Sequence, residues 1–395
     1  MGVNVVKLED VCEFYRGLTY SKKDEATFSD NIVLRASNID LDTSTLILDE
    51  LKYLKEDFVI PNDKKLQKDC IFICMSSGSK SHLGKVAYID RDYNYAFGGF
   101  MGLIKPKTNI LPRYLFYLLQ TPEYKELIKK LSNGININNI KFSDLKEFQF
   151  ELPSLEEQEK ILNILDKADE IRAKKKLAND KLDEFLKSTF ISKFGDPVTN
   201  NKNLPKQKLE MFLDNVRYGT STPPNFSDSG YSFIRATNIK KGRIVDEGMY
   251  FITEEEATKI SKCKLKENEI IIVRSGVNTG DTCIITRKYA GHYAGYDIIL
   301  TINDDELNPT YLNELLNTNY MTAVIKPLTR RAAQPHLNAD QIKNLEIILP
   351  PIEDQNKFAQ IVEYVEAQKQ KNELVIEQMN NLFNSLSQRA FKGEI

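Results

Sequence analysis

The chain has 395 residues, of which 41% are hydrophobic and 28% charged, and its formal net charge is −2. This length is sufficient for two domains of ordinary size, each with its own hydrophobic core. No run approaches the roughly 18 apolar residues of a membrane span, and the first ten residues lack the pattern of a signal peptide, so we expect a cytoplasmic protein. No segment is strongly basic, so any DNA site must come from the placement of charges and not from their sum.

The five cysteines predict reduced thiols, because their number is odd and no signal peptide precedes them. Cys70 and Cys74 lie in the apolar run CIFICM (70–75), and no second pair of metal ligands follows. We therefore expect buried thiols at these two positions, with a metal site as the alternative.

Residues 1–152 combine short strand-like runs with turn residues. The runs are IVLRAS (32–37), CIFICM (70–75) and KVAYID (85–90), and a helix-like PRYLFYLLQ (112–120) follows them. Strands and helices in this mixture predict an α+β globular domain, with a mostly β domain as the alternative.

Residues 153–195 predict one long helix. Pro153 and the acidic pair Glu156-Glu157 are typical of a helix start, and Gly195-Asp196-Pro197 is a stop signal. A ladder with alternating spacings of three and four residues indicates a coiled-coil seam, and a helix that packs on its own domain is the alternative. The ladder consists of Ile161, Ile164, Ala168, Ile171, Lys175, Ala178, Leu182, Phe185 and Thr189.

The second half of the chain repeats the first with an offset of roughly 197 residues, which is typical of a domain duplication. The matching segments are FIRATNIK (233–240) with VLRASNID (33–40), NPTYLNELL (308–316) with LPRYLFYLL (111–119), and ILPPIEDQNKF (348–358) with ELPSLEEQEKI (151–161). We therefore expect a second globular domain over 196–350 and a second long helix over 351–395.

The second helix carries an equivalent ladder, so we expect the two helices to pair in an antiparallel orientation. Lys175 and Asn372 are the middle rungs of the two ladders, and we predict that they lie near each other, where a polar pair would fix the register. The side chains predicted to pair the helices are Ile164, Ile171, Lys175, Leu182, Ile361, Asn372, Met379 and Leu382.

Three marks shared by both halves give the chain a family resemblance. They are LP-x-x-E-[ED]-Q at 152–158 and 349–355, the phrase R-A-[ST]-N-I, and the P-x-Y-L-x-x-L-L helix. In these marks and in its duplicated order, the chain resembles the specificity subunit of type I restriction–modification systems. The resemblance covers the whole chain and implies two target-recognition domains whose long helices pair as an antiparallel coiled coil.

The resemblance also implies a function and partners. Each recognition domain would read one half of a split double-stranded DNA target, and the helices would dock two methyltransferase subunits. Those subunits would bind S-adenosylmethionine and methylate adenine N6, while restriction subunits that use ATP and Mg²⁺ can join. The specificity subunit itself would carry no chemistry, no metal and no cofactor.

The sequence agrees with a non-catalytic chain. It contains no P-loop, no GxGxxG that opens a helix and no H-E-x-x-H motif, and its three histidines are scattered. PPNF (223–226) is close to the NPPF-type motif of adenine methyltransferases, but no nucleotide-binding glycine motif precedes it, so we interpret it as a loop.

Candidate DNA contacts are loop side chains that can donate or accept paired hydrogen bonds, because Arg pairs with guanine and Asn or Gln with adenine. In the first domain they are Arg35, Asn38, Ser77, Lys80, Lys85, Tyr95, Asn133, Asn136 and Asn138. In the second they are Arg235, Asn238, Lys240, Lys241, Arg274, Asn278, Arg330, Arg331, Gln334 and His336. Residues common to both domains favour scaffold or phosphate contact, so base reading is expected where the repeats differ, above all at 132–139 and 329–336.

Two alternatives remain open at this point. The chain could be a two-domain protein-binding scaffold without DNA, which the near-neutral charge favours slightly. It could also serve a fused or solitary modification system with other partners. The DNA target and the length of its spacer do not follow from the sequence.

Overall fold

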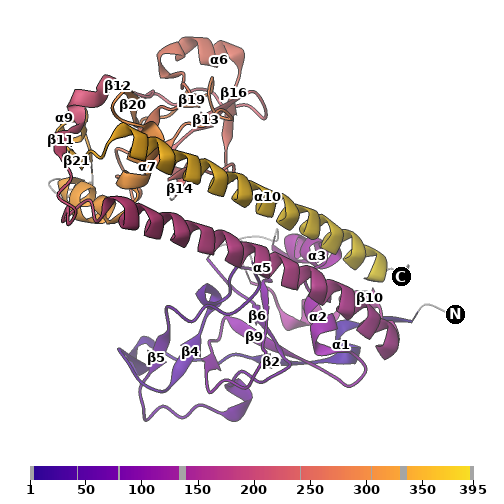
Figure 1. Cartoon of the computed structure of the whole chain (residues 1–395). Helices are drawn as coiled ribbons and strands as arrows, with labels where there is room; N and C mark the ends of the chain where they lie inside the picture. The colour runs from indigo at the N-terminus through magenta and orange to yellow at the C-terminus, as the bar shows by residue number, and fades with distance from the viewer. Residues whose placement is uncertain are drawn as a thin grey trace. The chain divides into compact units, whose positions relative to one another are not determined.

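The computed structural model describes residues 4–41, 43–78, 81–132, 139–240, 242–303, 305–329 and 336–391. The chain forms two compact units, one of residues 1–176 with 374–395 and the other of residues 177–373. Helices α5 (Leu155–Phe194) and α10 (Ile352–Phe391) are continuous and contribute to both units, and Figure 1 shows them in magenta and yellow. Each unit therefore holds one globular domain and a part of both long helices.

Each domain contains a four-stranded antiparallel sheet of the same order. In the first domain the order is β2 (Cys12–Arg16), β9 (Met101–Pro106), β6 (Ile71–Cys74) and β7 (Val86–Tyr88). In the second it is β12 (Leu213–Tyr218), β20 (Ile298–Ile302), β17 (Ile270–Ile272) and β18 (Thr282–Ile284). The central strands β6 and β17 are completely buried, which explains their continuous apolar sequence.

A second sheet is also shared, with a parallel pair at its edge. It consists of β3 (Glu25–Ala26), β5 (Lys52–Leu54), β4 (Ile32–Leu34) and β8 (Ala96–Phe97) in the first domain, and of β16 (Tyr250–Ile252), β13 (Tyr231–Ile234) and β19 (Tyr293–Ala294) in the second. Two-stranded sheets join β1 (Val5–Lys7) to β10 (Gln149–Glu151), β11 (Lys206–Lys208) to β21 (Glu346–Ile348), and β14 (Ile239–Lys240) to β15 (Arg243–Ile244).

Short helices complete both domains. They are α1 (Leu8–Val11), α2 (Pro112–Leu118), α3 (Pro122–Ser132) and α4 (Phe142–Lys146) in the first domain, and α6 (Glu254–Lys259), α7 (Pro309–Leu316), α8 (Lys326–Thr329) and α9 (Ala339–Lys343) in the second. The equal strand order confirms the predicted α+β class and the predicted duplication.

A buried glutamine explains the LP-x-x-E-[ED]-Q mark. Gln158 Oε1 accepts from the backbone N–H of Leu111 at 2.8 Å, and its Nε2 donates to the carbonyls of Asn109 and Pro153. Gln355 makes the same three bonds in the second unit, to Asn308, Glu306 and Pro350. Both glutamines are fully buried, so each fixes the start of its long helix against the start of α2 or α7.

Cys70 and Cys74 are buried, as predicted, at 1% and 0% exposure. Burial raises the pKa of both thiols to about 11, which disfavours the thiolate that a metal would require. Among the residues that the structure describes, no group of three or more potential metal ligands comes together.

The helices pair in an antiparallel orientation, as side-chain contacts within each unit show. In the second unit Phe190 packs edge-on against Phe358, with ring centroids 5.6 Å apart, and Lys369 Nζ lies 2.6 Å from Asp183 Oδ1. In the first unit the guanidinium of Arg172 lies over the ring of Phe383. Positions that rise along α5 thus meet positions that fall along α10, which confirms the predicted orientation.

The predicted seam was wrong at alternate rungs. Ile164, Ile171 and Leu382 are 40–43% exposed, whereas their neighbours Leu165 and Phe383 are buried. In α5 the inward positions are instead Ile161, Leu165, Ala168, Arg172, Lys175, Asn179, Leu182 and Leu186. The apolar pattern favours Ile164 and Ile171 because two of the true inward positions, Arg172 and Asn179, are polar.

The remaining predicted pairing residues are partly buried. Leu182 and Ile361 pack against the core of the second unit, and Met379 is half-buried on α10. Asn372 Nδ2 donates to Asn179 Oδ1 at 2.8 Å, so a polar pair does occupy the seam. Since Lys175 and Asn372 belong to different units, their proximity stays a prediction.

Candidate nucleic-acid interface

The asparagines of the repeated phrase are part of the scaffold. Asn38 is 1% exposed and Asn238 is completely buried. The side chain of Asn38 accepts from the backbone N–H of Arg35 at 2.9 Å and donates to the carbonyls of Ile47 and Glu50. Asn238 makes the equivalent bonds in its own domain. The predicted role of these two side chains in DNA binding is therefore corrected, because their amide groups are used to close a loop in the interior.

The two arginines of the phrase differ in their surroundings. Arg35 is exposed, whereas Arg235 is partly buried, with its guanidinium 3.6 Å from the centre of the Tyr250 ring. Arg235 Nη2 also donates to the carbonyl of Gly248 at 2.8 Å. The same residue type therefore makes different contacts in the two domains.

A cluster of polar and aromatic side chains forms where β12, β17 and β20 of the second domain meet two loops. The guanidinium carbon of Arg274 lies 4.5 Å from the ring centre of Tyr218 and 4.1 Å from that of Tyr296. Arg274 Nη2 lies 2.7 Å from His336 Nε2. Because a guanidinium can only donate, His336 Nε2 accepts this bond. We call Tyr218, Arg274, Tyr296 and His336 the arginine cluster.

Backbone pairing holds the arginine cluster in place. Arg274 lies two residues after the end of β17. Its carbonyl accepts from the N–H of Leu337 at 2.8 Å, and Ser275 pairs with His336 across a short antiparallel bridge. The loop then turns at Gly276, whose φ is +94°, and exposes Val277 completely. These bonds bring the loop after β17 against the end of the segment 329–336, one of the two segments in which we expected base reading.

A buried carboxyl group lies beneath the arginine cluster. Asp297 Oδ1 accepts from the backbone N–H of Arg274 at 3.1 Å, and Asp297 is only 4% exposed. Burial raises the pKa of Asp297 to about 6, although the backbone bond and the charge of Arg274 act in the opposite direction. The hydroxyl of Tyr218 accepts from the N–H of Ala339 at 2.9 Å, which fixes that ring from the other side.

The strand registers identify the equivalent positions in the first domain. Tyr218 pairs with Ile298 as Arg16 pairs with Gly102, and the carbonyl of Met75 accepts from Ile140 as that of Arg274 accepts from Leu337. The counterparts of the arginine cluster are therefore Arg16, Met75, Phe100 and Asn139. Phe100 is 73% exposed. The two domains thus have different side chains at four equivalent positions, although Met75 is buried in the core of the first domain.

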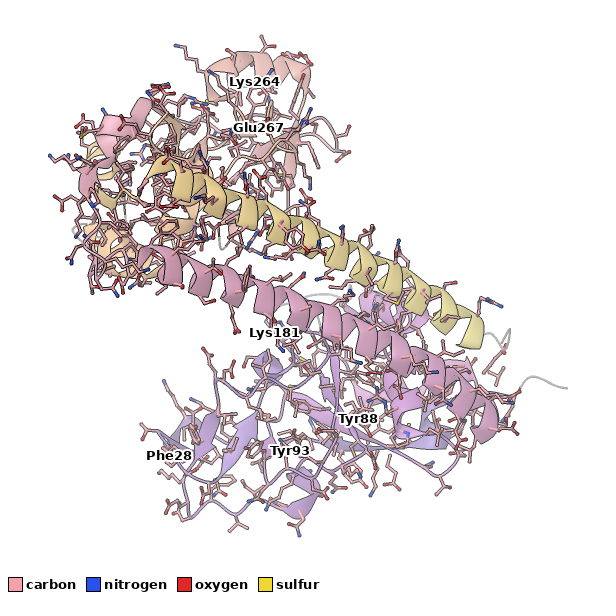
Figure 2. The ribbon with its side chains drawn as sticks, in the orientation of Figure 1. Phe28, Tyr88, Tyr93, Lys181, Lys264 and Glu267 are labelled. Carbon is pink, nitrogen blue, oxygen red and sulfur yellow. The ribbon has the colours of Figure 1, made fainter. Side chains whose placement is uncertain are left out.

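The other predicted contacts are distributed around these loops. Lys240 forms an ion pair with Glu247 at 3.2 Å, and Asn278 Nδ2 donates to the carbonyl of Ala236 at 3.2 Å. In the first domain Ser77 and Lys85 are half-buried. Tyr95, also half-buried, packs against Tyr93, which is labelled in Figure 2. Eight predicted residues lie outside the described ranges: Lys80, Asn133, Asn136, Asn138, Lys241, Arg330, Arg331 and Gln334.

Sequence reasoning missed the aromatic members of the interface. Tyr218, Tyr296 and Phe100 are at least 38% exposed although aromatic residues usually indicate core. A signal was present in the sequence, because the arginine cluster and its counterparts in the first domain differ in chemical type at three of the four positions.

Among the described helices none is long and apolar enough to cross a membrane.

The family is established by comparison with known proteins. The model of the type I restriction modification DNA specificity domain matches residues 1–182 and 217–378, which is most of the chain and covers both domains. A duplicated α+β domain with divergent strand-end loops and paired helices is the architecture of a DNA-recognition protein of this class. The chain belongs to the family of type I restriction–modification specificity subunits.

Individual relatives are similar over most of their length. The chain is 25% identical to the EcoKI specificity subunit of Escherichia coli K12, covering 99% of this chain and 89% of that protein, and 26% identical to the StySPI specificity subunit of Salmonella potsdam, covering 98% and 87%. Among solved structures, the S subunit of a type I system from M. genitalium superposes with a TM-score of 0.54 at 14% identity, over 98% of this chain and 96% of that one. This last similarity concerns the fold.

Proposed function

We propose that this chain reads a bipartite DNA sequence for a type I restriction–modification complex, with one domain for each half-site. The observation that carries the proposal is the contrast between identical strand order and divergent strand-end side chains in the two domains. Both domains match the DNA specificity family, which supports DNA as the ligand of each, and unequal side chains at equivalent positions suit half-sites of different sequence. The DNA target therefore need not be a palindrome.

The near-neutral net charge is compatible with this function. Phosphate contacts position a protein on the duplex, whereas base contacts specify the sequence. Both kinds of contact need hydrogen-bond donors at the DNA-binding surface and not a high net charge of the whole chain. Arg16 in the first domain and Arg274 in the second supply such donors, at the ends of different strands of the two sheets.

The partners follow from the family. In this proposal the chain acts in the cytoplasm, and its long helices dock two methyltransferase subunits that bind S-adenosylmethionine and methylate adenine N6. Restriction subunits that use ATP and Mg²⁺ complete the complex. The chain itself contributes recognition and no catalysis.

The helices would also set the gap between the half-sites, since α5 and α10 run without interruption from one unit into the other. Inserting one heptad into the paired part of both α5 and α10 should lengthen the unspecified gap between the two half-sites of the DNA target. The sequences of both half-sites should stay unchanged. An unchanged gap in the methylation map of that variant would contradict this part of the proposal.

Mapping of N6-methyladenine in a host that carries the chain with its methyltransferase tests the function. A motif with two specified parts and an unspecified gap of fixed length is expected. Methylation without any such motif would exclude bipartite reading, and the two-domain protein-binding scaffold would then be the better interpretation.

A further inference from the structure

Arg274 is held in a way that leaves a guanidinium edge for a ligand. The guanidinium carbon lies over the rings of Tyr218 and Tyr296, and among the described residues Nε is buried without a hydrogen-bond partner. Nη2 donates one bond to His336. Since a guanidinium carries five N–H groups, four of them on Nη1 and Nη2, this single bond leaves most of its Nη donors unused by the cluster.

A fixed, planar donor group at an exposed loop matches one particular base. Guanine presents two adjacent acceptors, O6 and N7, in the major groove, and a bidentate arginine is the commonest specific contact to them. Restraint by two aromatic rings reduces the side-chain entropy that an arginine loses on binding, so that more of the contact energy remains for discrimination.

We propose that Arg274 reads a guanine in the half-site of the second domain, and that Tyr218, Tyr296 and His336 position its guanidinium. This inference rests on the proposed function and adds to it one base in one half-site. It is specific to the second domain, because the equivalent residue in the first is Met75, which has no hydrogen-bond donor.

The alternative is that the arginine cluster only stabilises the loop after β17. The two roles differ in what a change of Arg274 does to sequence preference. A structural arginine would affect stability or overall affinity, and every DNA sequence would be affected equally. A reading arginine would affect one base pair.

The experiment uses the complete chain with its methyltransferase subunits and maps N6-methyladenine for wild type, Arg274→Met and Arg274→Lys. Methionine already occupies the equivalent position of the first domain, so the backbone accepts it. We expect Arg274→Met to lose the preference for guanine at one position by about 10-fold, with the other half-site and the gap unchanged. Arg274→Lys should recover only part of the preference, because lysine lacks the planar fork.

A second measurement changes the DNA as well as the protein. Wild-type complex is titrated with its target duplex in which single guanines of that half-site are replaced by 7-deazaguanine, which removes N7. One substitution should weaken wild-type binding about 10-fold and leave Arg274→Met binding unchanged. Tyr296→Ala should reduce this sensitivity to 7-deazaguanine, whereas a merely structural tyrosine would leave the ratio of the two affinities unchanged.

The outcomes separate the inference from the function on which it rests. An Arg274→Met motif identical to that of wild type, or equal affinity for all 7-deazaguanine duplexes, would overturn the role of Arg274 while the bipartite motif still stands. A wild-type map without a bipartite motif would overturn the proposed function itself.

Discussion

The two recognition domains of this chain have the same scaffold and different strand ends. Asn38 and Asn238 close equivalent loops, and Gln158 and Gln355 fix equivalent helix starts with three hydrogen bonds each. The arginine cluster of the second domain, in contrast, is not preserved. The equivalent positions of the first domain hold arginine, methionine, phenylalanine and asparagine. Duplication has therefore preserved these four buried amide side chains and changed the side chains of the arginine cluster.

The difference extends into the interior of the four-stranded sheet. In the second domain the two Nη atoms of Arg217 donate to the two carboxylate oxygens of Glu269, at 2.5 and 2.6 Å. Arg217 Nη2 also donates to the carbonyl of Lys264, a residue labelled in Figure 2. Burial alone would raise the pKa of Glu269, but the bonds from Arg217, the backbone of Lys266 and Thr301 lower it overall. The first domain has Tyr15 and Cys70 at the two positions of this pair.

Removal of this buried pair should have the largest effect on stability. Arg217→Met leaves Glu269, which is 2% exposed, as an uncompensated charge, so we expect the second domain to lose about 3–5 kcal/mol. Tyr15→Phe is the matched change in the first domain and should cost less than about 1 kcal/mol, because its bond to Glu13 lies at the surface. Hydrogen exchange measured peptide by peptide reports each domain separately, and equal losses in both would contradict this difference.

The corrected seam predicts opposite results for two adjacent residues. Leu165 is 1% exposed and Ile164 is 41% exposed, although the apolar ladder favours Ile164. Leu165→Ala should therefore destabilise the first unit by about 2–5 kcal/mol, and Ile164→Ala by less than about 1 kcal/mol. Urea denaturation followed by hydrogen exchange of α5 peptides checks both, and a larger loss at Ile164 would restore the original ladder.

The two buried glutamines test the shared part of the scaffold. Gln158→Ala and Gln355→Ala each remove three hydrogen bonds and leave a buried N–H without its acceptor, so each should cost about 2–4 kcal/mol in its own unit. Gln370→Ala, at an exposed position of α10, is the control and should change stability little. Unequal losses for the two buried glutamines, measured by the same exchange experiment, would show that the scaffolds are less alike than their bonds indicate.

The buried Asp297 should add a pH dependence to the stability of the second domain that has no equivalent at the matching position of the first. The folded pKa of Asp297 is raised to about 6 from its ordinary 3.8, so the folded state retains its proton longer than the unfolded state. This group therefore reduces stability as pH rises from about 4 to 6, by up to about 3 kcal/mol. Its counterpart in the first domain is Met101, which does not titrate.

Asp297→Asn tests this effect, because asparagine has no charge to bury. The variant should equal wild type near pH 4 and become more stable than wild type above pH 6. Urea midpoints measured from pH 4 to 8 give the difference between the two proteins at each pH. A difference that does not change with pH would mean that Asp297 titrates normally.

The sequence predicted the duplication, the domain class and the long helices, because these depend on patterns that extend over many residues. The 3-4 spacing located α5 and α10, yet the polar rungs Arg172 and Asn179 displaced the seam at alternate positions. The arginine cluster was found only in part, since Arg274 and His336 are polar loop residues whereas Tyr218 and Tyr296 resemble core. Strand register brings these four residues together, and register is not visible in the sequence of one strand.

The central claim is that divergent strand ends on a common scaffold read different half-sites. Replacing the arginine cluster with its counterparts, as Tyr218→Arg, Arg274→Met, Tyr296→Phe and His336→Asn in one chain, tests it most directly. N6-methyladenine mapping of a host that carries this variant with its methyltransferase should show a change in one half-site alone, with the other half-site and the gap as in wild type. A map in which neither half-site changes, or in which both do, would contradict the account.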